Sequence, residues 1–226
     1  MSDRLNSALE ESFYGNCAGL YDLVATAPGV RSWRSHTAAS LSLSRGDTVV
    51  EMGCGTGANF SYLRECVGSE GCVVGVDLVS AMLGQAERRI ERAGWENVHV
   101  VQGDATRPPV ENADAVVSTF VVGMLDDPGE AVRTWIRCVE PGGRVTLLNA
   151  ARSPRLLAFP LNLALRLFVR ATAPGHQFRF SSPVRVLEQR WDEACDALFE
   201  GTVDHHTERL GFGLVPLASG RVPSGP

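Results

Sequence analysis

The sequence predicts an α/β protein in which helices cover both faces of a doubly wound, mostly parallel sheet. Three observations indicate this fold. Apolar, β-branched runs recur along the chain, helical stretches separate most of them, and loops rich in glycine and aspartate follow the first strands. The 226 residues, 44% of them hydrophobic, suffice for one well-buried core and are few for two full domains.

The elements alternate in the order that parallel strands with helical crossovers require. Helices are predicted at 3–27, 30–43, from the glycine loop to about 66, and at 81–94, 128–139 and 183–200. Strands are predicted at 48–51, 72–77, 97–101, 113–122 and 144–150, with a turn at 140–143 before the last of them. Two segments about Gly211 resemble a terminal antiparallel hairpin, which gives a sheet of seven strands.

The first strand leads directly into a glycine-rich loop. Gly53, Gly55 and Gly57 follow Glu51 before a helical pattern resumes, so the segment predicts strand, tight loop and helix. Glycine allows positive φ angles and lets the backbone approach a ligand closely. The loop also matches the G-x-G-x-x-G/A pattern of dinucleotide-binding proteins, so by itself it indicates a nucleotide-like ligand without naming it.

An acidic residue ends the second strand. Asp77 closes CVVGVD about twenty residues after the glycines. A carboxylate at this place can accept hydrogen bonds from both ribose hydroxyls of an adenosine. Together, the loop and the acid predict a site for an adenosine-containing ligand at the carboxyl ends of the strands.

The ordered motifs EMGCGTG, GVD, GDA and EPGG, followed by an extra helix and a hairpin, resemble the class I S-adenosylmethionine-dependent methyltransferases. The resemblance covers roughly residues 21–222 and implies a Rossmann-like fold. The phrases YDLV, RSWR, VVGVDLVSAML and STFVVGMLDDP are similar to the branch that methylates quinone precursors and phospholipid amines. Beyond Ala151 the sequence departs from the quinone enzymes.

The resemblance implies S-adenosylmethionine as cofactor. Glu51 and the backbone of residues 53–57 would surround its methionine portion, and Thr119 and Phe120 would line its methyl-bearing end. This ligand has no pyrophosphate, and no Lys or Arg lies within residues 48–63. A sulfonium cation is stabilised instead by acids and by aromatic faces such as Phe120.

The same resemblance implies the adenosine contacts. Asp77 would hold the ribose, Leu78 and Met82 would flank the adenine, Asp104 would accept a hydrogen bond from the adenine amine, and the Ala105 amide would meet the ring. The cofactor-binding residues expected are Glu51, Gly53, Cys54, Gly55, Thr56, Gly57, Asp77, Leu78, Met82, Gly103, Asp104, Ala105, Thr119 and Phe120.

The positive charges are unevenly distributed. The 21 basic residues are all arginine, and seven of them lie within residues 141–187, which contain no Asp or Glu, although the whole chain has a net charge of −5. This asymmetry predicts one face that meets something anionic. Nucleic acid is not expected as a partner, because the net charge is negative and basic and aromatic residues are not interleaved in a patch.

Residues 151–182 are expected to form a basic, apolar insertion. In its 154–170 stretch, at 100° per residue, Arg155, Asn162, Arg166 and Arg170 fall on one narrow stripe. A transmembrane helix is not expected, since an arginine within the bilayer costs roughly 2.5 to 3.5 kcal/mol. Three interpretations stay open: a helix in the core or in a homodimer interface, a lid over an apolar substrate, and a helix lying in a membrane surface.

Methyl transfer from a sulfonium requires mainly the alignment of nucleophile, carbon and sulfur. A general base is needed only for a protonated amine or for a carbon that must become carbanion-like. Tyr21 and His176 are the candidate catalytic residues, followed by His36, His205 and His206. The expected acceptor is a small molecule that is lipophilic or anionic, such as a quinone precursor or a phospholipid.

Two other classes of function remain compatible with the sequence. A nicotinamide-dependent oxidoreductase would use the same glycines and Asp77, but it does not account for Asp104 and Ala105 together with the hairpin. A non-catalytic cofactor-binding protein would keep the fold. No metal site is expected, because the six cysteines lie far apart and show no Cys/His spacing suited to zinc.

The chain is expected to divide into three parts. Residues 1–45 would form an N-terminal helical cap, residues 46–222 the methyltransferase domain with its insertion at about 151–182, and residues 223–226 a disordered tail. No basic-then-apolar segment opens the chain, so a cytoplasmic protein is expected, with peripheral contact to anionic membranes through the arginine-rich segment.

Overall fold

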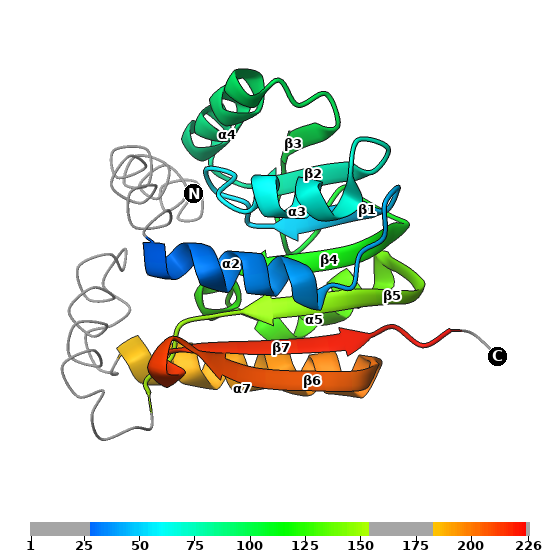
Figure 1. The fold of residues 1–226 in the computed structure, drawn as a ribbon. Coiled ribbons are helices and arrows are strands. Elements are labelled where there is room, and N and C mark those ends of the chain that lie inside the picture. The colour runs from blue at the N-terminus through cyan, green and yellow to red at the C-terminus, as the bar shows by residue number, and fades with distance from the viewer. Residues whose placement is uncertain (1–27, 154–182, 225–226) are drawn as a thin grey trace, which may run out of the picture.

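Seven strands form one sheet in the computed structural model, which describes residues 28–153 and 183–224 (Figure 1). The strand order is β3-β2-β1-β4-β5-β7-β6. The strands are β1 (Thr48–Met52), β2 (Cys72–Asp77), β3 (Val98–Gln102), β4 (Ala113–Thr119), β5 (Val139–Leu148), β6 (Val203–Leu210) and β7 (Val215–Arg221). The first five are parallel, and β7 is antiparallel to both β5 and β6. The predicted fold class and the terminal hairpin are therefore confirmed.

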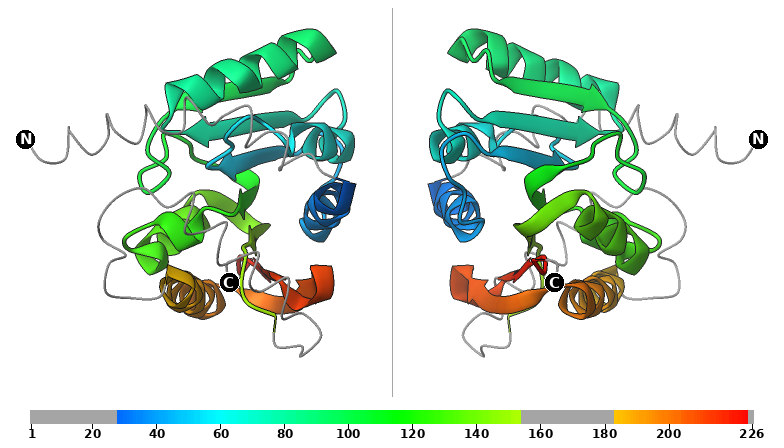
Figure 2. Two further views of the ribbon diagram at one scale, coloured as in Figure 1. Left: turned by 90° about the vertical axis from the view of Figure 1, so that its left-hand side faces the viewer. Right: turned by 90° about the vertical axis from the view of Figure 1, so that its right-hand side faces the viewer.

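Helices pack on both faces of the sheet, as the edge-on views show (Figure 2). Side chains of α2, α3 and α4 bury against one face, and side chains of α5 and α7 bury against the other. Successive strand residues point to opposite faces, so each strand contributes side chains to both layers. The largest fully buried side chains include Trp135 on one side and Phe60 on the other. The helices are α2 (Pro28–Ser40), α3 (Phe60–Val67), α4 (Ser80–Ala93), α5 (Pro128–Arg137) and α7 (Pro183–Gly201), with short 3₁₀ turns η1 (Val122–Met124) and η4 (Gly211–Gly213).

The turn predicted at 140–143 is wrong. These residues belong to β5, where Val139 pairs with Ala113 and Arg144 pairs with Ala115, so the residues between them bulge out of the ladder. Gly142 has a φ of 91°, which a glycine adopts without strain. The glycines that suggested a turn therefore make a bulge at the start of a longer strand.

The parallel strands all end at one edge of the sheet, which we call the carboxyl edge. The η4 turn between β6 and β7 lies at this edge too, since β7 runs antiparallel to β5 and Leu217 pairs with Leu148 at the end of β5. Within the described residues, no helix is both long and apolar enough to cross a membrane. The helix predicted at 3–27 and the stretch at 154–170 lie outside the described residues.

Candidate functional site

The glycine loop follows β1 at the carboxyl edge, and two of its glycines, Gly53 and Gly57, have no room for a side chain. Gly53 has a φ of 71°, and a Cβ atom added to it would lie 2.3 Å from Cγ2 of Val121. Gly57 has a φ of 72°, and its added Cβ would lie 2.5 Å from the ring of Phe60. The amides of Gly53 and Cys54 both donate to the carbonyl of Val76, at 2.8 and 3.0 Å, so the loop is tied to β2.

Asp77 lies directly against this loop. Its Oδ2 atom accepts a 2.7 Å hydrogen bond from the Gly55 amide, and its Oδ1 atom accepts a 2.9 Å bond from the Val79 amide. Burial raises the pKa of Asp77, and these backbone hydrogen bonds act in the opposite direction. Each carboxylate oxygen has a second lone pair, so both can still accept from the hydroxyls of a bound ligand.

Glu51 is buried at the foot of the loop, with only 1% of its surface exposed. Its Oε1 atom accepts hydrogen bonds from Nδ2 of Asn59 and, at 3.4 Å, from Oγ1 of Thr119. Its Oε2 atom is buried and has no hydrogen-bond partner among the described residues. Burial raises the pKa of Glu51 to about 7, against the opposing effects of Asn59 and of the positive charge of Arg34. A buried carboxyl group with one unpartnered oxygen suits a cationic ligand group.

Arg34 and Asn59 complete this cluster, and the sequence predicted neither of them as a site residue. Arg34 comes from α2 and is 4% exposed. Its Nη1 atom donates a 2.7 Å hydrogen bond to Oδ1 of Asn59, and its Cζ atom lies 5.9 Å from the centre of the Phe120 ring. Arg34 is the last residue of the RSWR phrase, but that phrase does not indicate a site role for it, because its partners are set by the tertiary fold.

Residues 48–63 contain no arginine, but arginines from other elements lie close to the glycine loop. Besides Arg34, Arg89 of α4 donates a 3.1 Å hydrogen bond from Nε to the Thr56 carbonyl. The positive charge of Arg34 lowers the pKa of Glu51, so a carboxyl group lies near this arginine, and a carboxyl group there is unfavourable for a pyrophosphate.

The end of β3 lies beside Asp77. The Gly103 amide donates to the Asp77 carbonyl at 2.9 Å. Oδ1 of Asp104 accepts 2.8 Å hydrogen bonds from the amide and the hydroxyl of Thr106, which fixes the carboxylate at the start of the following turn. The Ala105 carbonyl accepts a 2.7 Å bond from the indole of Trp135, and this bond anchors the segment to the core.

Two apolar residues follow Asp77 on the way into α4. Leu78 is exposed although it is apolar, whereas Met82 is buried in the first turn of the helix. An exposed leucine beside an acidic strand end is suited to contact a flat ring, which is the role that the sequence predicts for it.

Phe120, at the end of β4, has an unusual backbone conformation. Its φ is 63°, a region that bulky residues rarely occupy, and its amide donates a 2.7 Å hydrogen bond to the Leu148 carbonyl. Phe120, like Trp33 and Leu214, packs against the buried cluster that contains Leu148. Strained backbone of this kind is common at functional sites. It persists only where the surrounding structure holds it in place.

Asn149 follows β5 and carries the second unpartnered polar atom. Its Nδ2 atom is buried without a hydrogen-bond partner among the residues that the structure describes. Its carboxamide lies against the α-carbon of Gly123, where an added Cβ would lie 3.1 Å from Nδ2 and 2.5 Å from Leu187. Both unpartnered atoms, in Glu51 and in Asn149, therefore belong to residues at the carboxyl ends of strands.

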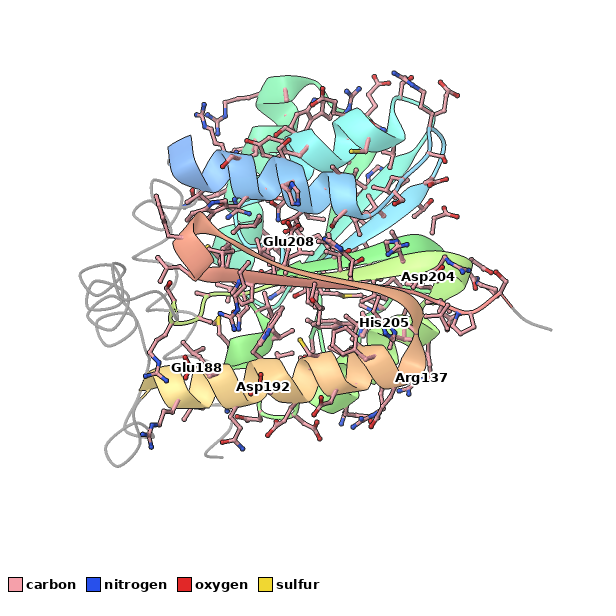
Figure 3. All side chains as sticks on the ribbon, turned by 60° about the horizontal axis from the view of Figure 1, so that its bottom comes forward. Arg137, Glu188, Asp192, Asp204, His205 and Glu208 are labelled. Atoms are coloured by element: carbon pink, nitrogen blue, oxygen red, sulfur yellow. The ribbon has the colours of Figure 1, made fainter. Side chains whose placement is uncertain are left out.

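The two candidate catalytic residues, Tyr21 and His176, lie outside the described residues. Of the other histidines, His36 contacts the Glu208 carboxylate, and His206 lies 3.6 Å from the same carboxylate. His205 instead packs against Phe199 of α7, on the other side of the sheet (Figure 3). Within the described ranges, no group of three His, Cys, Asp or Glu side chains is placed to hold a metal ion.

Comparison with known proteins identifies the domain. Residues 49–143, from β1 to the bulge of β5, match the family described as a methyltransferase domain. This stretch of the chain is similar to a methyltransferase domain. In this domain the glycine loop, Asp77 and the ends of β3 and β4 line one edge of the sheet.

Two solved structures share the methyltransferase fold. A SAM-dependent methyltransferase from Aquifex aeolicus superposes with a TM-score of 0.63 at 17% identity, over 84% of this chain and 89% of that one. A putative S-adenosyl-L-methionine-dependent methyltransferase from Methanococcus maripaludis superposes with a TM-score of 0.67 at 18% identity, over 95% of both chains.

Curated relatives match part of the chain. An aklanonic acid methyltransferase, DauC, from Streptomyces sp. (strain C5) is 32% identical over 106 residues, which are 46% of this chain and 48% of that protein. A demethylmenaquinone methyltransferase from Shouchella clausii is 27% identical over 124 residues, which are 54% of this chain and 53% of that protein. The chain spans about half the length of these relatives.

S-adenosylmethionine is the cofactor that this domain implies, and the site fits it. The cofactor has an ammonium group, for which Glu51 provides a buried, unpartnered oxygen. It has two ribose hydroxyls, for which Asp77 provides two carboxylate oxygens beside the loop. In the glycine loop, Gly53 and Gly57 have no room for side chains, and glycine lets the backbone approach a ligand closely.

Proposed function

We propose that this protein is an S-adenosylmethionine-dependent methyltransferase that acts on a small lipophilic acceptor. The observation that carries the proposal is the buried Glu51, whose Oε2 atom lacks a partner among the described residues and adjoins the glycine loop. A free, buried oxygen is costly to maintain, so a ligand cation that completes its hydrogen bonds would account for it.

The cofactor would supply a methyl group on a sulfonium, which passes to the acceptor nucleophile and leaves S-adenosylhomocysteine. The protein's own residues would hold the two partners in line. Glu51 would bind the ammonium group, Asp77 the ribose, and Leu78 and Met82 the faces of the adenine. Alignment of this kind can contribute on the order of 7 to 11 kcal/mol to a transfer reaction.

The proposed adenine and methyl ends lie on neighbouring strand ends. Asp104 would accept from the adenine amine, with Gly103 and Ala105 as backbone neighbours, and Thr119 and Phe120 would line the methyl-bearing end. The backbone of Gly53, Cys54, Gly55, Thr56 and Gly57 would enclose the methionine portion. Burial raises the pKa of the Cys54 thiol, so this side chain would stay neutral beside the sulfonium.

An apolar acceptor, such as a quinone precursor or a phospholipid-like molecule, is supported by the surface of the carboxyl edge. Large hydrophobic side chains are exposed at this edge within the described residues. Leu78 follows β2, Met124 lies in η1, and Phe212 lies in η4 with 70% of its surface exposed. Relatives named demethylmenaquinone methyltransferase and aklanonic acid methyltransferase agree with an apolar, oxygen-bearing acceptor.

Calorimetric titration with S-adenosylmethionine, and separately with S-adenosylhomocysteine, tests the cofactor. Wild-type protein should bind both in the micromolar range, and Asp77→Ala should weaken binding by about 2 to 3 kcal/mol. Asp192→Ala, on the exposed side of α7, is the matched control and should bind as wild type does. If neither ligand binds, the methyltransferase function is rejected and the nicotinamide-dependent alternative is favoured. A fluorescence titration with reduced nicotinamide is the test of that alternative.

Transfer of the labelled methyl group from S-adenosylmethionine to reduced naphthoquinones and to lipid extracts tests the acceptor. Product formation with the quinols but not with the lipids would favour the quinone-like class. If the cofactor binds and no acceptor is methylated, the non-catalytic alternative is favoured. Tyr21 and His176 stay candidates for a base, and Tyr21→Phe and His176→Ala in the same assay would test them.

The remaining assignments stay predictions. They are the helical cap at 1–45, the insertion at about 151–182, the tail at 223–226, a homodimer, and a cytoplasmic protein in peripheral contact with anionic membranes. Flotation with vesicles of anionic and of neutral lipid at low salt tests the membrane contact. Equal binding to both vesicle types would contradict it, because each arginine near an anionic surface contributes about 1 kcal/mol.

A further inference from the structure

The cluster around Glu51 is a chain of hydrogen bonds that joins one helix, two strands and the residue that precedes another helix. Arg34 lies on α2, Asn59 precedes α3, Glu51 is in β1, and Thr119 ends β4. The Arg34 guanidinium donates to Asn59 at 2.7 Å, and the Asn59 amide donates to Glu51 and, at 3.0 Å, to Thr119. All four residues are buried. A buried polar chain with each link satisfied fixes the orientation of its members.

The direction of this chain is set by Arg34. A guanidinium has only donors, so the atom of Asn59 that it meets must be the acceptor Oδ1. The two hydrogens of Nδ2 must then face Glu51 and Thr119. Without the arginine, the carboxamide could turn over and present its oxygen to Glu51, which only a protonated carboxyl group would tolerate.

The charge of Glu51 depends on the groups that face it from each neighbouring element. Arg34 of α2 and the amide of Asn59 lower its pKa, as does the hydroxyl of Thr119, whereas burial and the Asp77 carboxylate of β2 raise it to about 7. Cys54 is the other titratable side chain beside it, and burial keeps that thiol neutral. Loss of Arg34 removes this positive charge and the group that orients Asn59.

We propose that Arg34 is a positioning residue that orients the Asn59 carboxamide and thereby favours the ionised form of Glu51, whose second oxygen would meet the cofactor's ammonium group. The ligand part of this inference rests on the proposed function. The orientation of Asn59 and the ionisation of Glu51 are properties of the protein alone, so they can be tested without any ligand.

The ligand-free test is a carboxyl-¹³C NMR titration of protein labelled in glutamate, with the Glu51 signal identified by its absence from Glu51→Gln. The wild-type signal should titrate near pH 7. In Arg34→Met, which keeps the aliphatic stem, the midpoint should rise by about one pH unit or more, a tenfold gain in proton affinity. Arg34→Lys should recover part of the shift. An unchanged midpoint in Arg34→Met would overturn the proposal.

Two further variants separate this role from general damage to the fold. Arg92→Met makes the same chemical change at the exposed end of α4 and should leave the Glu51 midpoint unchanged. Asn59→Leu removes the carboxamide itself and should raise the midpoint as Arg34→Met does. If Asn59→Leu has no effect while Arg34→Met does, the charge of Arg34 acts directly and the positioning role is rejected.

The ligand arm measures the affinity for S-adenosylhomocysteine between about pH 5.5 and 8.5. Arg34→Met should bind about tenfold more weakly than wild type near neutral pH and approach wild type at the alkaline end, where Glu51 ionises in both. An equal loss at every pH would indicate a merely structural role and contradict the proposal. Absence of binding by wild-type protein would reject the proposed function, while the NMR titration would still decide the role of Arg34.

Discussion

The Asp77 carboxylate spans the gap between two strand ends, because its Oδ2 atom accepts a 2.7 Å hydrogen bond from the Gly55 amide while Asp77 itself ends β2. Its other oxygen accepts from the Val79 amide at the entry to α4. One side chain therefore fixes both the glycine loop, which is proposed to enclose the methionine portion, and the start of the next helix, which is proposed to flank the adenine.

Asp77→Asn should lower both stability and ligand affinity. One carboxylate oxygen becomes an NH₂ group that cannot accept, so either Gly55 or Val79 loses its partner, at a cost of about 1 to 3 kcal/mol. Denaturant unfolding measures the first effect, and titration with S-adenosylhomocysteine the second. Asp192→Asn on α7 serves as the control. A variant as stable as wild type would show that these bonds contribute little.

Gly53→Ala should destabilise the protein more than Gly94→Ala does. Both glycines have positive φ, 71° and 64°, so both variants strain the backbone by about 1 to 2 kcal/mol. Only at Gly53 does the new Cβ also meet a neighbour, Val121 at 2.3 Å, whereas nothing lies within 4 Å of the added Cβ at Gly94. Overpacking costs about 1 to 3 kcal/mol more. Thermal melts of the two variants give the difference, and equal losses would exclude a role for the Val121 contact.

Glu51→Gln should make the stability of the protein less dependent on pH. The pKa of Glu51 is about 7 in the folded protein and near 4.5 when exposed. Between these values the unfolded chain has lost the proton that the folded protein keeps, so stability falls as pH rises, by on the order of 3 kcal/mol for this group. Glutamine does not titrate. Unfolding at about pH 4 and pH 8 should therefore show a smaller difference in the variant. An identical difference would mean that Glu51 ionises normally.

Asn149→Leu should leave stability unchanged or raise it. The Nδ2 atom of Asn149 is buried and has no partner among the described residues, and leucine has a similar shape without the cost of an unsatisfied donor. Asn97→Leu is the matched comparison, since its Nδ2 atom donates to the Gly68 and Gly71 carbonyls at 2.8 and 2.7 Å. That variant should lose about 2 kcal/mol or more. Comparable losses in both would show that Asn149 has a partner after all.

Much of the fold was predictable because its signals are local. β-Branched runs such as CVVGVD and the glycines after Glu51 specify strands and a loop from their own sequence, and the resemblance of the motifs to a methyltransferase domain is confirmed by the family match. The bulge at Gly142 was mistaken for a turn, because the same glycines favour both and only pairing with Ala113 distinguishes them.

The parts of the site that escaped prediction depend on tertiary contacts. Arg34 and Asn59 are 25 positions apart, and neither the RSWR phrase nor the glycine loop indicates that their side chains meet. Their importance follows from burial beside Glu51, which no local periodicity encodes. Asn149 was predicted only as part of a strand, because an unsatisfied hydrogen bond becomes visible once every neighbour is placed.

The position of β7 between β5 and β6 determines when the sheet can be completed during synthesis. The edge of β5 pairs with residues 217–221, which leave the ribosome some seventy residues after β5 itself. Until then the hydrogen-bonding groups of β5 are open to other chains, and Leu147 and Leu148 lack the buried Leu217 and Ala218 beside them. A nascent chain interrupted before β7 would therefore expose the hydrogen-bonding edge of β5 together with Leu147 and Leu148, which favours aggregation.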